Sequence, residues 1–262
     1  MDKNYELKYH KEELKNWWFI SRRNMLHLLF RKYNIPKTAH ILDIGCAGGI
    51  FLTELQKKNY TNVYALDYSA DAIALCKKNG IARAFVMDGH EPNFPPNTFD
   101  VIIASDSLEH LKDDQKALHN WNKVLKENGI IIVYVPAYMF LWSEHDDINY
   151  HFRRYTRKEL VRKMHTEQFL IIKSGYWNMG IFLPTALVRL LQKLKKKNPS
   201  EPKQDQLIAL PNVLTMMLVG WMKFENWLGS FIQLPFGVST YAIVRKKNIT
   251  AVKTAVVEKE AE

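Results

Sequence analysis

Short apolar runs alternate with helical stretches between residues 40 and 136 of this 262-residue chain, and this alternation constrains the fold most strongly. Each run is nearly all apolar, which is typical of strands that are buried on both faces of a sheet. Strands that alternate with helices favour crossover units and therefore a parallel sheet. The runs are AHILDI, NVYALD, ARAFVM, FDVIIAS and GIIIVYVP. We predict a doubly wound α/β fold.

The regions on either side of this alternation have other patterns. Residues 3–33 have helical periodicity, and their aromatic side chains are too many for a free surface helix. FLIIKSGYW and STYAIVRKK are two further strand candidates, separated by a helical stretch at 180–236 that several prolines interrupt. The predicted parts are an N-terminal helical lid at 1–36, a core at 37–178 with 238–248, a helical insertion or cap at 179–237 and a disordered tail at 249–262.

Local signals place two helix ends. Thr156 followed by Glu159 forms a capping box, so a helix is expected from 156 to 166. Asn128-Gly129 is expected to end the helix that precedes the GIIIVYVP strand.

The composition excludes several classes of protein. Cys46 and Cys76 are the only cysteines, so a disulfide framework or a cysteine zinc site is not expected, and a reducing compartment is. The N-terminus is polar and no run of 18 apolar residues occurs, so we expect a cytoplasmic protein, with peripheral contact at the inner membrane face as an option. A net charge of +10 favours acidic partners such as nucleic acid or anionic lipid.

A glycine-rich turn after the first strand carries the strongest functional signal. Gly45, Gly48 and Gly49 let a ligand approach the backbone, and the following helix presents free N–H groups. Two acids follow the next strands, Asp67 after the second and Asp88 after the third. Ligands of open α/β sheets bind at such carboxyl ends. The dinucleotide pattern G-x-G-x-x-G fits poorly, and no Gly-Lys-Ser/Thr of a P-loop follows.

With these residues the chain resembles the class I S-adenosylmethionine-dependent methyltransferases. The family's acid and alternate glycines match Asp43, Gly45, Ala47 and Gly49, with Ala47 in place of the middle glycine. The resemblance implies a Rossmann-like sheet of seven strands, mostly parallel, with a final antiparallel strand. It also implies S-adenosyl-L-methionine as the cofactor, with its methionine part near Asp43 and its ribose on Asp67. The expected cofactor residues are Arg22, Asp43, Gly45, Cys46, Ala47, Gly48, Gly49, Asp67, Tyr68, Met87, Asp88, Gly89 and Ser105.

The Ser-Leu-Glu-His segment at 107–110 resembles members that methylate small molecules, including ubiquinone-pathway O-methyltransferases. Three other stretches resemble a bacterial group among them, and this signature does not fix a substrate. They are Trp17-Trp18-Phe19 with Arg22-Arg23, Leu141 to Asp146 followed by His151 to Thr156, and Pro235 to Ser239.

Three histidines are candidates for the catalytic base, because a hydroxyl acceptor must lose a proton. They are His110, His145 and His151, all after carboxyl ends of strands. Asp106-x-x-Glu109-His110 also resembles a divalent-metal set of some related enzymes. We expect instead that Glu109 and His110 cap a helix and line the pocket, with no metal.

Three hypotheses about the function stay open. The preferred one is oxygen or nitrogen methylation of a small or lipid-linked metabolite. The alternative is an RNA methyltransferase, supported by pI 9.4 and by basic clusters at 153–163 and 193–197, although nucleic-acid methyltransferase motifs are missing. A binding module without catalysis is the third. Oligomeric state is not indicated by the sequence.

The stretch at 180–236 bears on this choice. Leu187, Leu190, Leu191 and Leu194 share one face of a predicted helix, and Arg189, Lys193, Lys196 and Lys197 the other. Val213 to Met222 is apolar all round and is expected to be buried. A packed cap over the site is one interpretation. An apolar entrance for a lipid-linked acceptor at an anionic membrane is the other.

Overall fold

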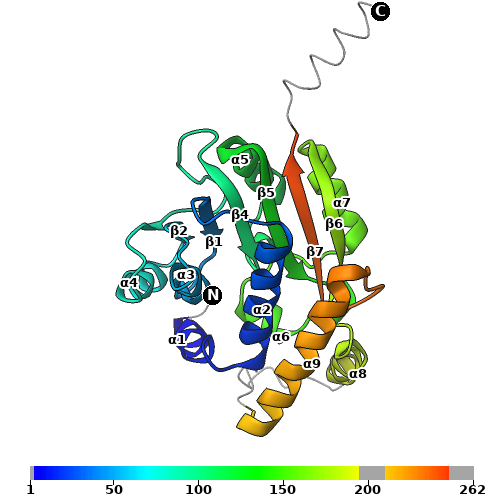
Figure 1. Ribbon diagram of the computed structural model, residues 1–262. Coiled ribbons are helices and arrows are strands. Elements are labelled where there is room, and N and C mark those ends of the chain that lie inside the picture. The colour runs from blue at the N-terminus through cyan, green and yellow to red at the C-terminus, as the bar shows by residue number, and fades with distance from the viewer. Residues whose placement is uncertain (1–2, 195–209, 248–262) are drawn as a thin grey trace, which may run out of the picture.

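The computed structural model describes residues 3–194 and 210–247, and its centre is a seven-stranded sheet (Figure 1). The strand order is β3-β2-β1-β4-β5-β7-β6. Only β7 runs antiparallel to its neighbours β5 and β6, so the predicted seven-stranded, mostly parallel sheet is confirmed. The strands are β1 His40–Ile44, β2 Asn62–Asp67, β3 Ala84–Val86, β4 Phe99–Ser105, β5 Leu125–Pro136, β6 Phe169–Trp177 and β7 Ser239–Lys246.

Helices cover both faces of the sheet. On one face lie α2 Trp17–Lys32, α3 Ile50–Gln56 and α4 Ala70–Lys78. On the other face lie α5 Asp114–Val124 and α7 Arg157–Thr166. The remaining elements are α1 Lys3–Glu12, η1 Leu108–His110, η2 Met139–Leu141, α6 Glu144–Ile148, α8 Phe182–Leu194 and α9 Asn212–Phe231.

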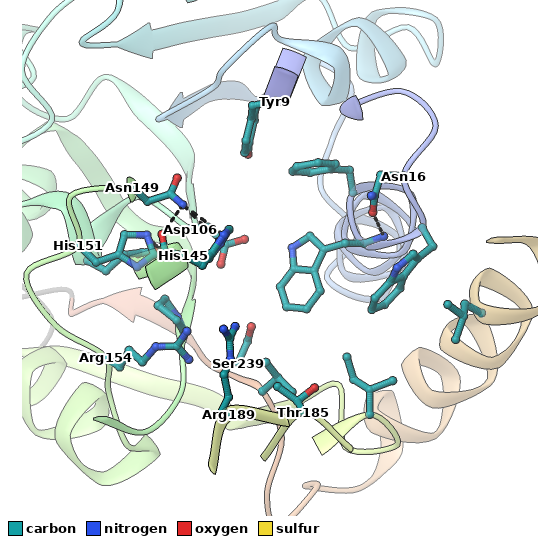
Figure 2. Close-up of a pocket in the computed structure, with 18 of the residues that line it drawn as sticks. Tyr9, Asn16, Asp106, His145, Asn149, His151, Arg154, Thr185, Arg189 and Ser239 are labelled. Atoms are coloured by element: carbon teal, nitrogen blue, oxygen red, sulfur yellow. Dashed lines mark hydrogen bonds and ion pairs between the residues drawn. The ribbon is translucent and has the colours of Figure 1, made fainter. Parts of the chain in front are cut away.

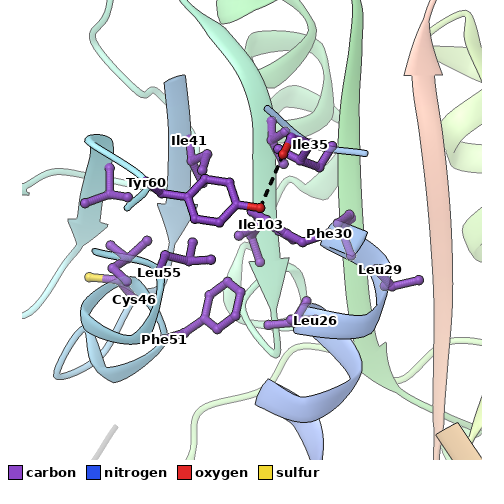
Figure 3. Close-up of a cluster of buried hydrophobic side chains, with 14 of the residues drawn as sticks. Leu26, Leu29, Phe30, Ile35, Ile41, Cys46, Phe51, Leu55, Tyr60 and Ile103 are labelled. Carbon is purple, nitrogen blue, oxygen red and sulfur yellow. Dashed lines mark hydrogen bonds between the residues drawn. The ribbon is translucent and has the colours of Figure 1, made fainter. Parts of the chain in front are cut away.

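The core on the first face joins α2 to the sheet (Figure 3). Leu26, Leu29 and Phe30 of α2 pack against buried residues of α3 and of the strands. The ring of Phe30 lies edge-on to that of Phe51, with centroids 5.6 Å apart. Burial of this many apolar side chains, each worth about 1.5–3 kcal/mol, fixes α2 on the sheet.

The two local expectations about helix ends have different outcomes. The capping box of Thr156 and Glu159 is confirmed at the start of α7. The helix before β5 ends at Val124, four residues before the expected stop, and Asn128 instead has a φ of 62° inside β5. The strand forms early because Leu125 already pairs with Phe99 of β4, and an irregularity in register takes up the turn at Asn128.

The expected single helix at 3–33 is two helices. The helical stretch is interrupted between α1 and α2, where Asn16 accepts a hydrogen bond from the backbone of Trp18 and caps α2. A buried N-cap of this kind ends one helix and starts the next. Pro184 does not interrupt α8, because it lies in the first turn, where no intrahelical N–H is needed.

The C-terminal helices depart from the packed cap in an informative way. Val213, Met216 and Met217 are exposed, although the sequence predicted their burial. Arg189, expected on the outer polar face of α8, is buried. No helix in residues 3–194 and 210–247 is long and apolar enough to cross a bilayer. Lys196, Lys197 and the predicted tail at 249–262 lie outside the described residues.

Candidate active site

The strand register brings the predicted acids to one edge of the sheet. Asp43 is one residue from the end of β1, and Asp67 ends the neighbouring β2. Asp88 follows β3 by two residues, and Ser105 ends β4 on the other side of β1. The carboxylate of Asp67 accepts hydrogen bonds from the backbone of Ala47 and Ser69, at 3.0 and 2.9 Å. These bonds fix the carboxylate beside the glycine-rich loop.

The glycine-rich loop packs so tightly against neighbouring side chains that a side chain at Gly45 would not fit. A Cβ on Gly45 would lie 2.7 Å from the Cβ of Ser107, so the loop passes close to η1. Gly45 and Gly49 have φ values of 76° and 71°, and Ala47 lies in the same left-handed region at 47°. The position of Ala47 therefore requires a left-handed backbone conformation as well as a small side chain. An L-residue there costs roughly 1–2 kcal/mol relative to glycine.

Helix α1 and its C-terminal extension cover this loop. Glu13 accepts a hydrogen bond from the backbone of Gly48 at 3.2 Å, and Glu6 accepts one from the hydroxyl of Ser69. Burial raises the pKa of Asp43 to about 7, and the charges of Glu13 and Asp67 add to the rise. The N-terminal segment thus covers the glycine-rich loop, as expected of a lid. It adds the carboxylates of Glu6 and Glu13 to those of Asp43 and Asp67.

The residues expected at the adenine lie at a more open part of the edge. Tyr68 is 82% exposed, and Asp88 accepts hydrogen bonds from the backbone and ring of His90. Met87 is half-buried and Gly89 is buried, its carbonyl accepting from the indole of Trp121 at 2.8 Å.

Arg22 on α2 lies between the two halves of the site. Its guanidinium stacks between the rings of Tyr134 and Trp177, 4.2 and 4.1 Å from their centroids. It also reaches the hydroxyl of Ser105 at 3.3 Å and the carboxylate of Asp106 at 3.3 Å. Arg22 and Ser105, two of the expected cofactor residues, are therefore in contact. Their role toward the cofactor stays a prediction.

A cavity of about 370 Å³ opens next to Arg22, at the carboxyl ends of β4 and β5 (Figure 2). It is lined by the N-terminal aromatics, by η1, by the segment 137–155 and by α8 and α9. All three predicted histidines line it, and so do Arg154 and Arg189. The aromatic side chains of the wall are Tyr9, Trp17, Trp18 and Phe19. The lining does not include the glycine-rich loop, Asp67 or Asp88.

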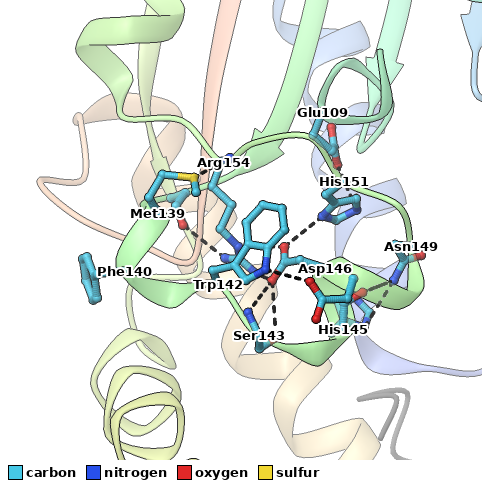
Figure 4. A network of polar contacts seen from close by, with 12 residues as sticks. Glu109, Met139, Phe140, Trp142, Ser143, His145, Asp146, Asn149, His151 and Arg154 are labelled. Carbon is cyan, nitrogen blue, oxygen red and sulfur yellow. Dashed lines mark hydrogen bonds and ion pairs between the residues drawn. The ribbon is translucent and has the colours of Figure 1, made fainter. Parts of the chain in front are cut away.

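A buried carboxylate organises the polar side of the cavity (Figure 4). Asp146, fully buried in α6, accepts from Nδ1 of His151 at 2.8 Å. The same carboxylate accepts from Nε and an Nη of Arg154, at 2.8 and 3.0 Å. Burial alone would raise the pKa of Asp146, but the hydrogen bonds from His151 and Arg154 outweigh it and hold this pKa well below its usual value. His151 is thereby fixed with Nε2 directed away from Asp146.

The other two histidines lie in drier surroundings. Burial and, to a smaller extent, nearby His151 lower the pKa of His110 to about 3. Burial also lowers the pKa of His145 to about 4 against the attraction of Asp146. Both imidazoles are therefore uncharged at neutral pH. His145 is held by Asn149, whose amide donates to the His145 carbonyl at 2.7 Å.

Glu109 lies beside His151 in the wall of the cavity. Both carboxyl oxygens of Glu109 are buried without a hydrogen-bond partner, and Oε1 lies 4.0 Å from Nε2 of His151. Burial raises the pKa of Glu109 well above its usual value, and the charge of Asp106 adds to this. Within the described parts of the chain, Glu109, His110 and His151 form a group whose ligand atoms lie within 4.8 Å of one another.

This group has the donors that Mg²⁺, Mn²⁺ or Zn²⁺ would accept. The set differs from the one that the resemblance implied, because His151 replaces Asp106, which pairs with Arg22. The expected helix cap is not what Glu109 does, since its side chain makes no cap hydrogen bond at η1.

Sequence analysis missed the residue at the centre of this network. Asp146 and Arg154 both lie in the second of the three quoted stretches, but nothing in their spacing showed that they pair. The first and third stretches also reach the cavity, through Trp17 to Phe19, and through Ser239, which accepts from Arg22 at 3.3 Å. The stretches quoted for their pattern therefore meet around one cavity.

Comparison with known proteins agrees with this arrangement. A family model described as "Methyltransferase domain" matches residues 42–133, which hold the glycine-rich loop, the strand-end acids and β5. This part of the chain belongs to the class I S-adenosylmethionine-dependent methyltransferases. The methyl donor of this family is S-adenosyl-L-methionine.

Individual relatives of this methyltransferase differ in what their names say they methylate. It is 30% identical over 148 residues to the mitochondrial ubiquinone biosynthesis O-methyltransferase of Schizosaccharomyces pombe, covering 49% of this chain and 53% of that one. It is 29% identical over 134 residues to human EEF1A lysine methyltransferase 2, covering 45% and 56%. The chain thus spans about half the length of these curated relatives. A methyltransferase structure from Archaeoglobus fulgidus shares the fold, with a TM-score of 0.53 at 20% identity, covering 91% and 99%.

Proposed function

We propose that this methyltransferase transfers a methyl group to an oxygen or nitrogen of a small or lipid-linked metabolite bound in the 370 Å³ cavity, in contact with an anionic membrane. The observation that carries the proposal is His151, which hydrogen-bonds to buried Asp146 and lines the cavity opposite a set of aromatic rings. Cofactor residues and cavity lie side by side at the carboxyl edge of the sheet, as donor and acceptor sites must.

The loop residues fit the cofactor. Gly45 and Gly49, whose Cβ atoms would collide with Ser107 and Cys76, keep the loop turned tightly beside Asp67. Asp67 would hold the ribose hydroxyls and Asp43 the methionine amino group. Bound there, S-adenosylmethionine supplies the methyl group as a sulfonium, a good leaving group.

His151 removes the acceptor proton in this proposal. Its Nδ1 donates to Asp146, which leaves Nε2 as the acceptor nitrogen and fixes the tautomer. When Nε2 takes the proton of an acceptor hydroxyl or amine, the buried charge of Asp146 stabilises the imidazolium. Burial raises the pKa of Glu109 well above its usual value, and in its protonated form this carboxyl would donate a hydrogen bond to the acceptor. The aromatic wall excludes water, and positioning of the acceptor supplies much of the rate.

The RNA alternative loses support from the basic cluster at 153–163. Arg154 is buried on Asp146, and Arg153 and Lys163 both pair with Asp114, at 2.9 and 2.8 Å. Of the second cluster, Lys193 donates to the carbonyl of Phe140 and the others lie outside the described residues. Because carboxylates neutralise Arg153, Arg154 and Lys163, these three residues contribute little to phosphate binding.

The test uses S-adenosylmethionine with a labelled methyl group and three fractions of a cell extract: water-soluble metabolites, solvent-extracted lipids and RNA. We expect label in the metabolite or lipid fraction. His151→Asn should reduce labelling by about 10²-fold or more, because general-base catalysis is lost, while calorimetric cofactor affinity stays unchanged. Label in RNA alone, or a His151→Asn protein with normal turnover, would contradict the proposal.

The cofactor assignment has its own test in the pH dependence of binding. Because the pKa of Asp43 is raised to about 7, this carboxyl is largely protonated in the free protein below that pH. An ammonium ligand prefers the ionised form, so affinity should rise with pH up to about 7, by as much as about tenfold per unit. Asp43→Asn should flatten the profile, and Asp67→Ala should weaken binding at every pH.

A further inference from the structure

Helices α8 and α9 are built with their polar side inward. The buried residue of α8 is Arg189, and those of α9 include Glu225, Asn226 and Ser230. The inward polar groups of α9 have hydrogen-bond partners. Glu225 accepts from the backbone of Met179 and Gly180 at 2.8 and 2.9 Å. Asn226 accepts from the indole of Trp177 at 2.6 Å and donates to the carbonyl of Ser21.

The outward side of both helices is apolar. On α9, Met216 is 73% exposed, Phe224 51% and Phe231 70%. The rings of Trp221, Phe224, Trp227 and Phe231 form a row along the helix, each 5.3–6.0 Å from the next. We call the following set the outer face: Leu183, Leu187, Leu190, Leu191, Leu194, Met216, Met217, Trp221, Phe224, Trp227 and Phe231. An exposed apolar area of this size marks an interaction surface.

The charges on these helices select the partner. The only acid of α8 and α9, Glu225, is buried, and the exposed charged residues are Lys193 and Lys223. Lys32 and Lys173 donate to carbonyls at the end of α9, so the neighbouring surface is basic as well. A symmetric pair of outer faces would bring lysines toward lysines. An anionic lipid surface accepts apolar and cationic side chains together.

The same helices also line the cavity. Thr185 and Arg189 of α8 and Leu218 of α9 are part of its wall. A lipid-linked acceptor held in a bilayer beside the outer face would therefore enter the cavity without crossing water.

We propose that the outer face docks the methyltransferase on an anionic membrane, so that the cavity receives a lipid-linked acceptor from the bilayer. This inference rests on the proposed function for its acceptor, but the docking itself does not depend on methyl transfer.

The test is cosedimentation of the full chain with vesicles of phosphatidylcholine, with and without phosphatidylglycerol. Wild-type protein should bind the phosphatidylglycerol vesicles at low salt and bind the neutral ones more weakly. Met217→Glu combined with Phe224→Glu should lower the partition coefficient by about tenfold or more, because two apolar side chains leave the lipid. Lys223→Glu should weaken binding to the anionic vesicles alone. Leu170→Glu, an exposed apolar residue on β6, is the matched control and should bind as the wild type does.

Three results would overturn the docking proposal. The first is wild-type protein that ignores both kinds of vesicle. The second is a wild-type dimer that the double variant converts to a monomer, since a second copy would then cover the face. The third is a double variant that loses stability as a core variant does, since the chain itself would then cover the face. Cofactor calorimetry on the same samples separates these results from a failure of the proposed function, because the outer face lies outside the cofactor residues.

Discussion

Helices α2 and α9 pack against each other, and both are rich in apolar residues, yet they use them in opposite ways. Helix α2 buries Met25, Leu26, Leu29 and Phe30 against the sheet. Helix α9 buries Glu225 and Asn226 and exposes its aromatic row. Apolar periodicity shows which residues share a face, but it does not show whether that face points to the protein or away from it.

The largest expected effect comes from one substitution made on each helix. Phe30→Ala should destabilise the fold by about 3–5 kcal/mol, because it leaves a cavity between the rings of Phe51 and Tyr60. Phe224→Ala removes the same atoms from an exposed position and should change stability by about 0.5 kcal/mol or less. Urea unfolding of both variants measures the difference. Equal losses would end the comparison, because the outer face would then be a core.

A second prediction concerns the buried charges that the cavity shares with the inward side of α8. Asp146→Asn should cost about 2–3 kcal/mol, because buried Arg154 loses its counter-charge. Since the pKa of Asp146 is held below that of an unfolded chain, its contribution is complete above pH about 4 and is lost as the pH falls further. Wild-type stability should therefore fall more steeply than that of Asp146→Asn as the pH drops below about 4. Parallel curves would show that Asp146 is not ionised in the folded protein.

The smallest effect tests the polar side of α9 itself. Glu225→Gln replaces one of two acceptor oxygens with an amide that cannot accept from a backbone N–H, and should cost about 1–2 kcal/mol. Phe231→Gln, a polar substitution on the outer face, should be tolerated or slightly favourable in water. Thermal unfolding compares the two variants. If Phe231→Gln is the more damaging change, the orientation of α9 is wrong.

Much of the nucleotide side of the site could be predicted from the sequence, because it depends on neighbours along the chain. An apolar strand that ends in an acid and a glycine turn places Asp43 and Gly45, and the register of parallel strands places Asp67 beside them. The loop at Ala47 was judged only by size. Its left-handed backbone could not be seen, because φ at one residue depends on how the whole turn closes.

The acceptor side could be predicted only in outline. His145 and His151 were expected after the carboxyl end of β5, and both line the cavity. The pairing of Asp146 with His151 and Arg154 joins residues from a short helix and an irregular stretch, for which no periodicity exists. A buried carboxylate that accepts from several donors is a property of tertiary contact and not of spacing.

The sequence by itself determined the sheet, the cofactor loop and the identity of the faces of each helix, because these follow from the order of apolar and polar residues along the backbone. The tertiary structure decided which face of α8 and α9 turns inward. Glu225 and Asn226 find backbone and indole partners on the protein, whereas the aromatic row does not. A buried polar group without a partner costs more than an apolar side chain left at the surface, so the partners available on the folded core set the orientation.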